Sequence, residues 1–204
     1  MFRRLFMRLR PDIRNNVYII YRAFLMIIKL TLIDQLAKWW LISYLARQPM
    51  RIVKLGDFLE IVYVWNYGIS FGIFRNYLQY SNSVFIVLNI LIILYLCRNL
   101  LSIRSITSFW GYNFIIGGAL GNVADRCIHG AVFDFICFHY KHYYWFPVFN
   151  IADSFIFIGA LLVLHDFYKT KKNIEAQQEQ LYNSWARKAE IICKISDAKI
   201  DQNK

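Results

Sequence analysis

Two aspartates, Asp134 and Asp153, lie on either side of an aromatic segment in a chain that is otherwise strongly apolar. Asn150, Asp153 and Ser154 fall at i, i+3 and i+4, so they share one helix face. This face is costly against lipid, and we expect it to point into a helix bundle. If Asp134 folds against Asp153, the two carboxyl groups cannot both ionise easily, and they share a proton. Such a pair can deprotonate a water and protonate a departing amine, as amide hydrolysis requires.

The same region allows other interpretations. Either aspartate can instead form a salt bridge with Arg126. Asp34 and Lys38 are four residues apart, so they share a helix face and can pair. We interpret them as a structural ion pair, with a direct catalytic role as the alternative. A Ser–Lys catalytic pair of Ser70 with Lys38 is a further alternative, although no G-x-S-x-G turn accompanies it.

The histidines and cysteines do not follow a metal-binding pattern. The sequence contains no His-Glu-x-x-His and no Cys-x-x-Cys, and no three-ligand zinc spacing is evident. His139 and His142 lie three residues apart, and we interpret them as interfacial residues rather than metal ligands. Cys127 and Cys137 can form a disulfide outside the cytosol, but we expect free thiols because cysteine is a common apolar filler.

The composition places the chain among membrane proteins. Its 204 residues suggest one domain, and 58% of them are hydrophobic and 18% aromatic. With a mean hydropathy of +0.35, the chain is too apolar for an ordinary soluble domain. The net charge of +11 can indicate nucleic acid or a membrane surface. The charges gather at the two ends and in one middle stretch, which is typical of topology signals, so we expect no nucleic-acid partner.

Four apolar runs predict membrane-spanning helices, since a span needs about 20 mostly apolar residues. The runs cover residues 23–41, 84–96, 106–120 and 148–164. The second is short but extends upstream through residues 81–82. Gly117, Gly118 and Gly121, at the outer end of the third run, allow close helix packing.

Lysine and arginine set the expected orientation. They precede the first run, lie between the second and third at Arg98 and Arg104, and follow the fourth from Lys169. The positive-inside rule makes this side the cytosol, so both termini are cytosolic and residues 42–80 and 122–147 face outward. We expect a basic cytosolic extension over residues 1–22 without a cleavable signal peptide, a four-span domain over 23–168 and a charged cytosolic tail over 169–204. A helix is expected in the tail around residues 174–192.

The two outer segments have different patterns. Residues 58–65 are aromatic and β-branched, which predicts a short strand. Residues 138–147 are rich in tyrosine and tryptophan, which predicts a loop at the level of the lipid headgroups. The predicted fold is an all-α membrane protein of four transmembrane helices with a small extracytoplasmic β-element and both termini cytosolic.

Five short blocks along the chain resemble those of lipoprotein signal peptidase, the signal peptidase II family. A single block is weakly specific, but five in this order on four spans are highly specific. The resemblance covers about residues 20–168. The blocks are D-Q-L-A-K at 34–38, N-Y-G-I-S-F at 66–71, G-G-A-L-G-N-V-A-D-R at 117–126, G-A-V-F-D-F at 130–135 and F-N-I-A-D-S at 149–154.

The resemblance implies an aspartic dyad near the outer membrane surface, which maps to Asp134 and Asp153. It implies that further residues line, brace or support the site. Ile69 and Ser70 depart from the family, which commonly has small alanines there. The implied lining and supporting residues are Asn66, Gly68, Asn122, Asp125, Arg126, Asn150, Asp34 and Lys38.

The resemblance also implies an activity and a location. The activity is intramembrane endopeptidase cleavage of bacterial prolipoproteins, at the bond before a cysteine that carries a diacylglyceryl group. The implied location is the inner membrane, with the site near its periplasmic face. The implied enzyme is a monomer surrounded by membrane lipids. No metal or organic cofactor is needed, and inhibition by the cyclic peptide globomycin is expected.

Two other classes of protein fit parts of the sequence. A small transporter or proton conductor would use the buried aspartates and lysines as a relay, although four spans without inverted repeats make this weaker. A structural membrane subunit would use them only to hold its helices together. Ion flux without peptide release would indicate the first, and loss of stability rather than turnover in aspartate variants would indicate the second.

Overall fold

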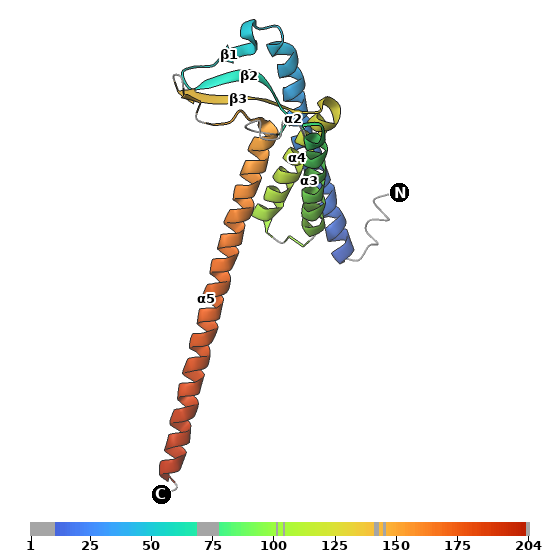
Figure 1. The fold of residues 1–204 in the computed structure, drawn as a ribbon. Coiled ribbons are helices and arrows are strands. Elements are labelled where there is room, and N and C mark those ends of the chain that lie inside the picture. Colours follow the sequence, from blue (N-terminus) through green and yellow to red (C-terminus); the bar gives the residue numbers. More distant parts are fainter. Residues whose placement is uncertain are drawn as a thin grey trace. The chain divides into compact units, whose positions relative to one another are not determined.

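The computed structural model describes residues 11–68, 78–100, 102–103, 105–140, 143–144 and 146–202. The chain divides into two compact units, Met1–Val163 and Leu164–Lys204, the second of which is described as helix. The elements, most of which are labelled in Figure 1, follow in chain order. They are α2 (Pro11–Leu45), the 3₁₀ helix η1 (Pro49–Arg51), β1 (Ile52–Lys54), β2 (Leu59–Asn66), α3 (Leu78–Leu100), α4 (Ile106–His129), β3 (Val132–Tyr140), β4 (Tyr143–Tyr144) and α5 (Ile151–Gln202).

Three predicted spans lie wholly in helices and the fourth begins three residues before α5, and the helices are longer than the apolar runs. Helix α2 begins at Pro11, where proline is tolerated because the first helical N–H has no partner within the helix. Helix α4 continues nine residues past its apolar run, to His129. Helix α5 begins at Ile151 and includes the helix predicted in the tail. Hydropathy marks the part that suits lipid, whereas backbone hydrogen bonds set the helix length.

Two helical segments of the described chain are long and apolar enough to cross a membrane, Asn82–Leu100 and Ile151–Lys188. Helix α2 carries Lys29, Asp34 and Lys38 within its apolar run, and α4 ends in a polar turn. Asp34 and Lys38 are fully buried, whereas large apolar side chains cover the exposed face of α2. This division is the one expected of a helix that turns its charges into a bundle.

The strands form one small antiparallel sheet in the order β1-β2-β3-β4. The strand predicted over residues 58–65 is confirmed as β2. The loop predicted over residues 138–147 is wrong, because β3 continues to Tyr140 and pairs with β4. Aromatic residues favour both strands and membrane interfaces, so composition alone did not distinguish the two.

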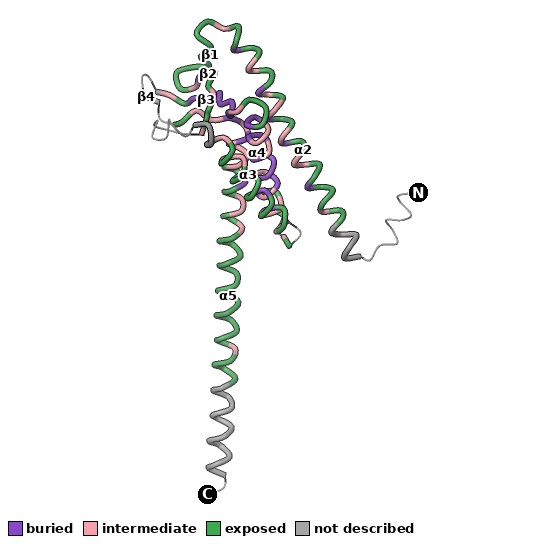
Figure 2. Tube along the Cα trace, turned by 45° about the vertical axis from the view of Figure 1, so that its right-hand side comes forward, coloured by how far each residue is buried: buried purple, intermediate pink, exposed green. Residues whose placement is uncertain are grey.

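The buried residues gather where α2, α4 and the strands meet (Figure 2). One apolar cluster joins α3 to α4 through Ile93, Leu96 and Ile116. The other packs Leu45, at the end of α2, against Phe133 and Phe135 of β3. The second cluster fixes the sheet to the end of α2, and the strand that it holds carries Asp134.

Helix α4 approaches its neighbours closely at several glycines, of which Gly118 and Gly121 lie nearest its polar end. A Cβ atom on Gly121 would lie 2.6 Å from Asp34 Oδ2, and one on Gly118 would meet the backbone oxygen of Ala152. Helices without side chains at their contact can pack this closely. These glycines therefore permit α2 and α5 to bring their polar residues onto α4.

Gly121→Ala is expected to destabilise the protein by about 1–3 kcal/mol, because the added methyl group overpacks the contact with Asp34. The free energy of unfolding can be measured by SDS titration in mixed micelles. Ala160→Val enlarges an exposed side chain of α5 and serves as the control. Equal stability of the two variants would contradict the close contact.

Candidate active site

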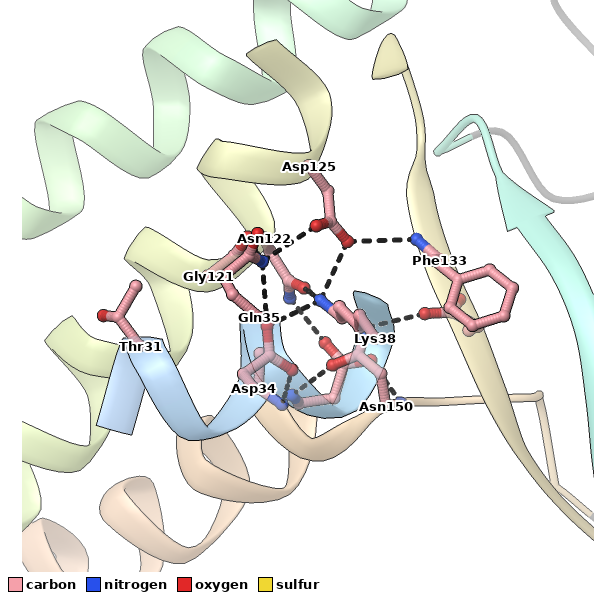
Figure 3. Close-up of polar contacts among 12 residues, drawn as sticks. Thr31, Asp34, Gln35, Lys38, Gly121, Asn122, Asp125, Phe133 and Asn150 are labelled. Atoms are coloured by element: carbon pink, nitrogen blue, oxygen red, sulfur yellow. Dashed lines mark hydrogen bonds and ion pairs between the residues drawn. The ribbon is translucent and has the colours of Figure 1, made fainter. Parts of the chain in front are cut away.

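Lys38 of α2 lies at the centre of a buried ion cluster (Figure 3). Its Nζ is 2.8 Å from Asp34 Oδ2, 2.8 Å from Asp125 Oδ2 and 3.1 Å from Asn122 Oδ1. Asp34 and Lys38 pair as their spacing predicts. Because Asp125 and Asn122 belong to α4, the cluster joins the first and third predicted spans.

The two carboxylates bound to Lys38 also hold the backbone of the next two elements. Asp34 Oδ1 accepts a hydrogen bond from the Ala152 N–H at 2.9 Å, in the first turn of α5. Asp125 Oδ2 accepts one from the Phe133 N–H at 3.1 Å, in β3. Each bond holds the residue immediately before one of the two predicted catalytic aspartates.

Asn150 and Asp153 form a reciprocal cap at the start of α5. The Asp153 N–H donates to Asn150 Oδ1 at 2.9 Å, and the Asn150 N–H donates to Asp153 Oδ2 at 3.2 Å. This is the geometry of a capping box, with asparagine and aspartate in place of the usual side chains. The cap sets the side-chain direction of Asp153 relative to the helix end.

Two asparagines connect the aspartates. Asn150 Nδ2 donates to Asp134 Oδ1 at 2.7 Å, and Asn122 Nδ2 donates to Asp153 Oδ1 at 2.8 Å. Asn150 Nδ2 also lies 3.2 Å from Asn122 Oδ1. The fold therefore brings Asp134 of β3 and Asp153 of α5 into one hydrogen-bonded network, although 18 residues separate them.

Asn66 of β2 holds the other oxygen of Asp134. Its Nδ2 donates to Asp134 Oδ2 at 2.9 Å, while its Oδ1 accepts the Gly68 N–H at 2.7 Å. Gly68 has φ of +85°, a conformation that favours glycine. The block around residues 66–68 is thus a short turn that aims the Asn66 amide at the carboxyl group.

Burial raises the pKa of Asp134 to about 6. The hydrogen bond from Asn66 lowers this pKa, the negative charge of Asp153 raises it, and the hydrogen bond from Asn150 lowers it. The desolvation of the carboxylate outweighs its two amide donors. Asp134 therefore holds a proton more readily than a free aspartate does.

Arg126 does not form the salt bridge proposed as an alternative. No ion pair among the described residues joins Arg126 to Asp134 or Asp153. The guanidinium lies 4.8 Å from the ring centre of Phe85, and its buried Nε and Nη1 have no acceptor among the described residues. The salt-bridge prediction is wrong for these residues because the aspartates bind amides instead.

Three polar residues of the network were not among the predicted site residues. Gln35 Nε2 donates to Asp125 Oδ1 at 2.8 Å, and Thr31 Oγ1 donates to the Gly117 carbonyl at 3.0 Å. Thr31 lies three residues before Asp34, and Gln35 lies four residues after Thr31, so helical spacing could have identified both. Asn82 Nδ2 donates to the backbone oxygen of Arg126 at 3.1 Å, and nothing in its sequence position indicates this.

The other candidate residues have different surroundings or lie outside the described residues. His139 is largely buried, with Nε2 3.5 Å from Glu60 Oε1, and its position at the membrane–water interface stays a prediction. His142 and Ser70 lie outside the described residues. Cys127 and Cys137 are free thiols. The described residues include no group of three or more His, Cys, Asp or Glu that fits a metal ion.

The fold matches solved structures of bacterial membrane enzymes. One, determined by the in meso method at 2.3 Å, aligns with a TM-score of 0.63 and 27% identity over 76% of this chain and 92% of that chain. A second, at 1.9 Å, aligns with a TM-score of 0.61 and 26% identity over 72% of this chain and 93% of that chain. Fold and site thus define a helical membrane enzyme.

The sequence comparisons give the family. A profile of the signal peptidase (SPase) II family matches residues 26–169. The lipoprotein signal peptidase of Rickettsia felis is 50% identical over 83% of this chain and 86% of its own. That of Rickettsia akari is 52% identical over 80% and 83%. The chain belongs to the signal peptidase II family of aspartic peptidases, which confirms the resemblance seen in the sequence blocks.

Lys38→Met is expected to destabilise the protein by about 3–5 kcal/mol, because it leaves Asp34 and Asp125 buried without a cation. The free energy of unfolding in mixed micelles measures this loss. Lys54→Met is the matched control, since the Lys54 side chain is 76% exposed and its ion pair is worth about 0–1 kcal/mol. Equal losses in the two variants would show that the ion cluster does not hold the helices.

Proposed function

We propose that this enzyme removes signal peptides from diacylglyceryl-modified bacterial prolipoproteins, with Asp134 and Asp153 as its catalytic pair. The cut falls before the lipidated cysteine. The observation that carries the proposal is the pair of asparagine bridges, from Asn150 to Asp134 and from Asn122 to Asp153. These bonds hold two acids from different elements, β3 and α5, in one network, as a shared-proton mechanism requires.

The two aspartates take different roles in this proposal. Asp153 removes a proton from a water, whose oxygen attacks the scissile carbonyl carbon. Asp134, protonated beforehand, donates a hydrogen bond to the oxygen on which negative charge develops. The proton on Asp153 then passes to the leaving nitrogen as the C–N bond breaks. The products are the carboxyl end of the signal peptide and the amino group of the lipidated cysteine.

Arg126 can contribute to substrate binding, and the contacts of Lys38 argue against the alternative Ser–Lys mechanism. The buried Nε and Nη1 of Arg126, which have no acceptor among the described residues, can bind a backbone carbonyl of the substrate. Lys38 Nζ already has three oxygen acceptors, which leaves no free amine for a Ser–Lys mechanism. The pair of acids is thus better supported than the alternative nucleophile.

The proposed setting is the inner membrane, crossed four times, with both termini in the cytosol. The exposed face of α2 presents large apolar residues, and Asp34 and Lys38 point into the bundle, as a span requires. The dyad then lies near the periplasmic surface, where the acyl chains of the substrate fix the depth of the scissile bond. The enzyme acts as a monomer without a cofactor, and globomycin-type inhibitors are expected to bind it.

Asp134→Asn and Asp153→Asn are each expected to reduce cleavage of a diacylglyceryl-modified prolipoprotein by at least about 10³-fold, because an amide at position 153 cannot take the proton of the water and an amide at position 134 is a far weaker acid than the carboxyl group that faces the oxyanion. The assay uses purified protein in micelles and measures release of the signal peptide. Asp57→Asn changes an exposed outer aspartate and serves as the control. Full activity in either dyad variant would remove the dyad from the mechanism.

The raised pKa of Asp134 predicts an alkaline limit to activity. Above about pH 6, Asp134 of the free enzyme loses its proton, so kcat/KM is expected to fall as the pH rises through this value. Asn66→Ala removes a hydrogen bond that lowers this pKa, so the limit is expected to move to higher pH. Asn99→Ala, which removes a bond within α3, is the control. An unmoved limit in Asn66→Ala would exclude Asp134 as the group that sets it.

A further inference from the structure

A second polar feature lies far from the dyad, between the N-terminal halves of α2 and α4. A cavity of about 400 Å³ opens there, and Arg22 and Lys29 are its only charged lining residues among those described. The rest of its wall is apolar, with Phe109, Trp110 and Phe114 supplied by α4. An apolar cavity with two cations and no acid suits an amphiphile that carries negative charge.

Lys29 has no partner that explains its position. It lies within an apolar run of α2, where a charge costs at least about 2.5 kcal/mol on insertion scales. No ion pair or hydrogen bond among the described residues involves it. Its side chain is exposed at the cavity, so an acceptor from outside the chain can reach it.

Arg22 lies seven residues before Lys29, which places the two on one face of α2, about 10 Å apart along the helix. Side chains on a helix lean toward its N-terminus, so both cations point toward the N-terminal end of α2. The Arg22 guanidinium lies 5.8 Å from the ring centre of Phe109 and 5.6 Å from that of Tyr18. Stacking between rings leaves the edge of the guanidinium free to donate hydrogen bonds.

We propose that this cavity binds an anionic phospholipid of the cytoplasmic leaflet. Arg22 and Lys29 bind the phosphate, and an acyl chain lies along the apolar wall beside Phe109 and Phe114. This proposal rests on the orientation given above, with the N-terminal end of α2 in the cytosol, and does not depend on the catalytic role of either aspartate.

Charge argues against the other occupants. The start of a signal peptide is positively charged, so Arg22 and Lys29 repel it. A zwitterionic lipid carries its own cation and gains less from the pair than an anionic lipid does. Free inorganic phosphate satisfies the two cations but leaves the apolar wall uncovered.

Native mass spectrometry of the 204-residue protein in micelles tests the proposal. Each sample contains phosphatidylglycerol and phosphatidylcholine in equal amounts. We expect one phosphatidylglycerol to remain bound to the unchanged protein, and Arg22→Gln/Lys29→Gln to weaken its binding by about 30-fold, since each cation contributes about one factor of five. Arg98→Gln/Lys172→Gln removes the same charge from exposed sites on α3 and α5 and is expected to retain the lipid.

A charge-conserving variant and a cleavage assay serve as controls. Arg22→Lys/Lys29→Arg keeps both charges and is expected to bind the lipid, which separates loss of charge from loss of fold. Prolipoprotein cleavage in phosphatidylcholine micelles is expected to persist in the Gln double variant, because neither residue belongs to the catalytic network. Equal lipid binding in all variants, or displacement by millimolar inorganic phosphate or by a synthetic signal peptide, would overturn the proposal.

Discussion

The ammonium group of Lys38, buried among three oxygens, is the contact on which the rest of the site depends. The two carboxylates that bind it, Asp34 and Asp125, reach onward to the backbone N–H groups of Ala152 and Phe133. Those residues directly precede Asp153 and Asp134. A buried ion pair contributes little net stability compared with a well-packed apolar contact. Its effect here is positional, because it links α2 and α4 to the start of α5 and to β3.

The same arrangement gives the two acids different surroundings. Asp153 lies in the first turn of α5, where the helix dipole and a backbone N–H stabilise negative charge. Asp134 lies on a strand, buried, with two amide donors and no direct cation, and its pKa is raised. An acid and a base made from one residue type need such a difference in surroundings. Asn150 makes the two environments interdependent, since it caps α5 and binds Asp134 at once.

The sequence predicted the parts of this molecule that follow from local pattern. Hydropathy located four helices, and helical spacing identified the pair of Asp34 and Lys38. Prediction from the sequence pattern was wrong where one composition suits two structures, as in the aromatic segment that forms part of β3 and β4 rather than a loop. It also failed where a contact depends on tertiary packing. The packing of α3 against α4 sets the bond from Asn82 to the Arg126 carbonyl. It also sets the contact of the Arg126 guanidinium, which lies against Phe85 rather than an aspartate.

The polar network also contributes to the association of the helices. Inside a bilayer the hydrophobic effect does not drive helices together, so close backbone contact and hydrogen bonds between helices must do so. Gly121 lets α4 reach Asp34, and Gln35 and Thr31 donate from α2 to backbone carbonyls of α4. The groups that join α2 to α4 are therefore part of the cluster that positions the dyad. A change to this cluster that keeps both Asp134 and Asp153 is still expected to move them, because Asp125 binds both Lys38 of α2 and the Phe133 N–H, and Asp34 binds both Lys38 and the Ala152 N–H.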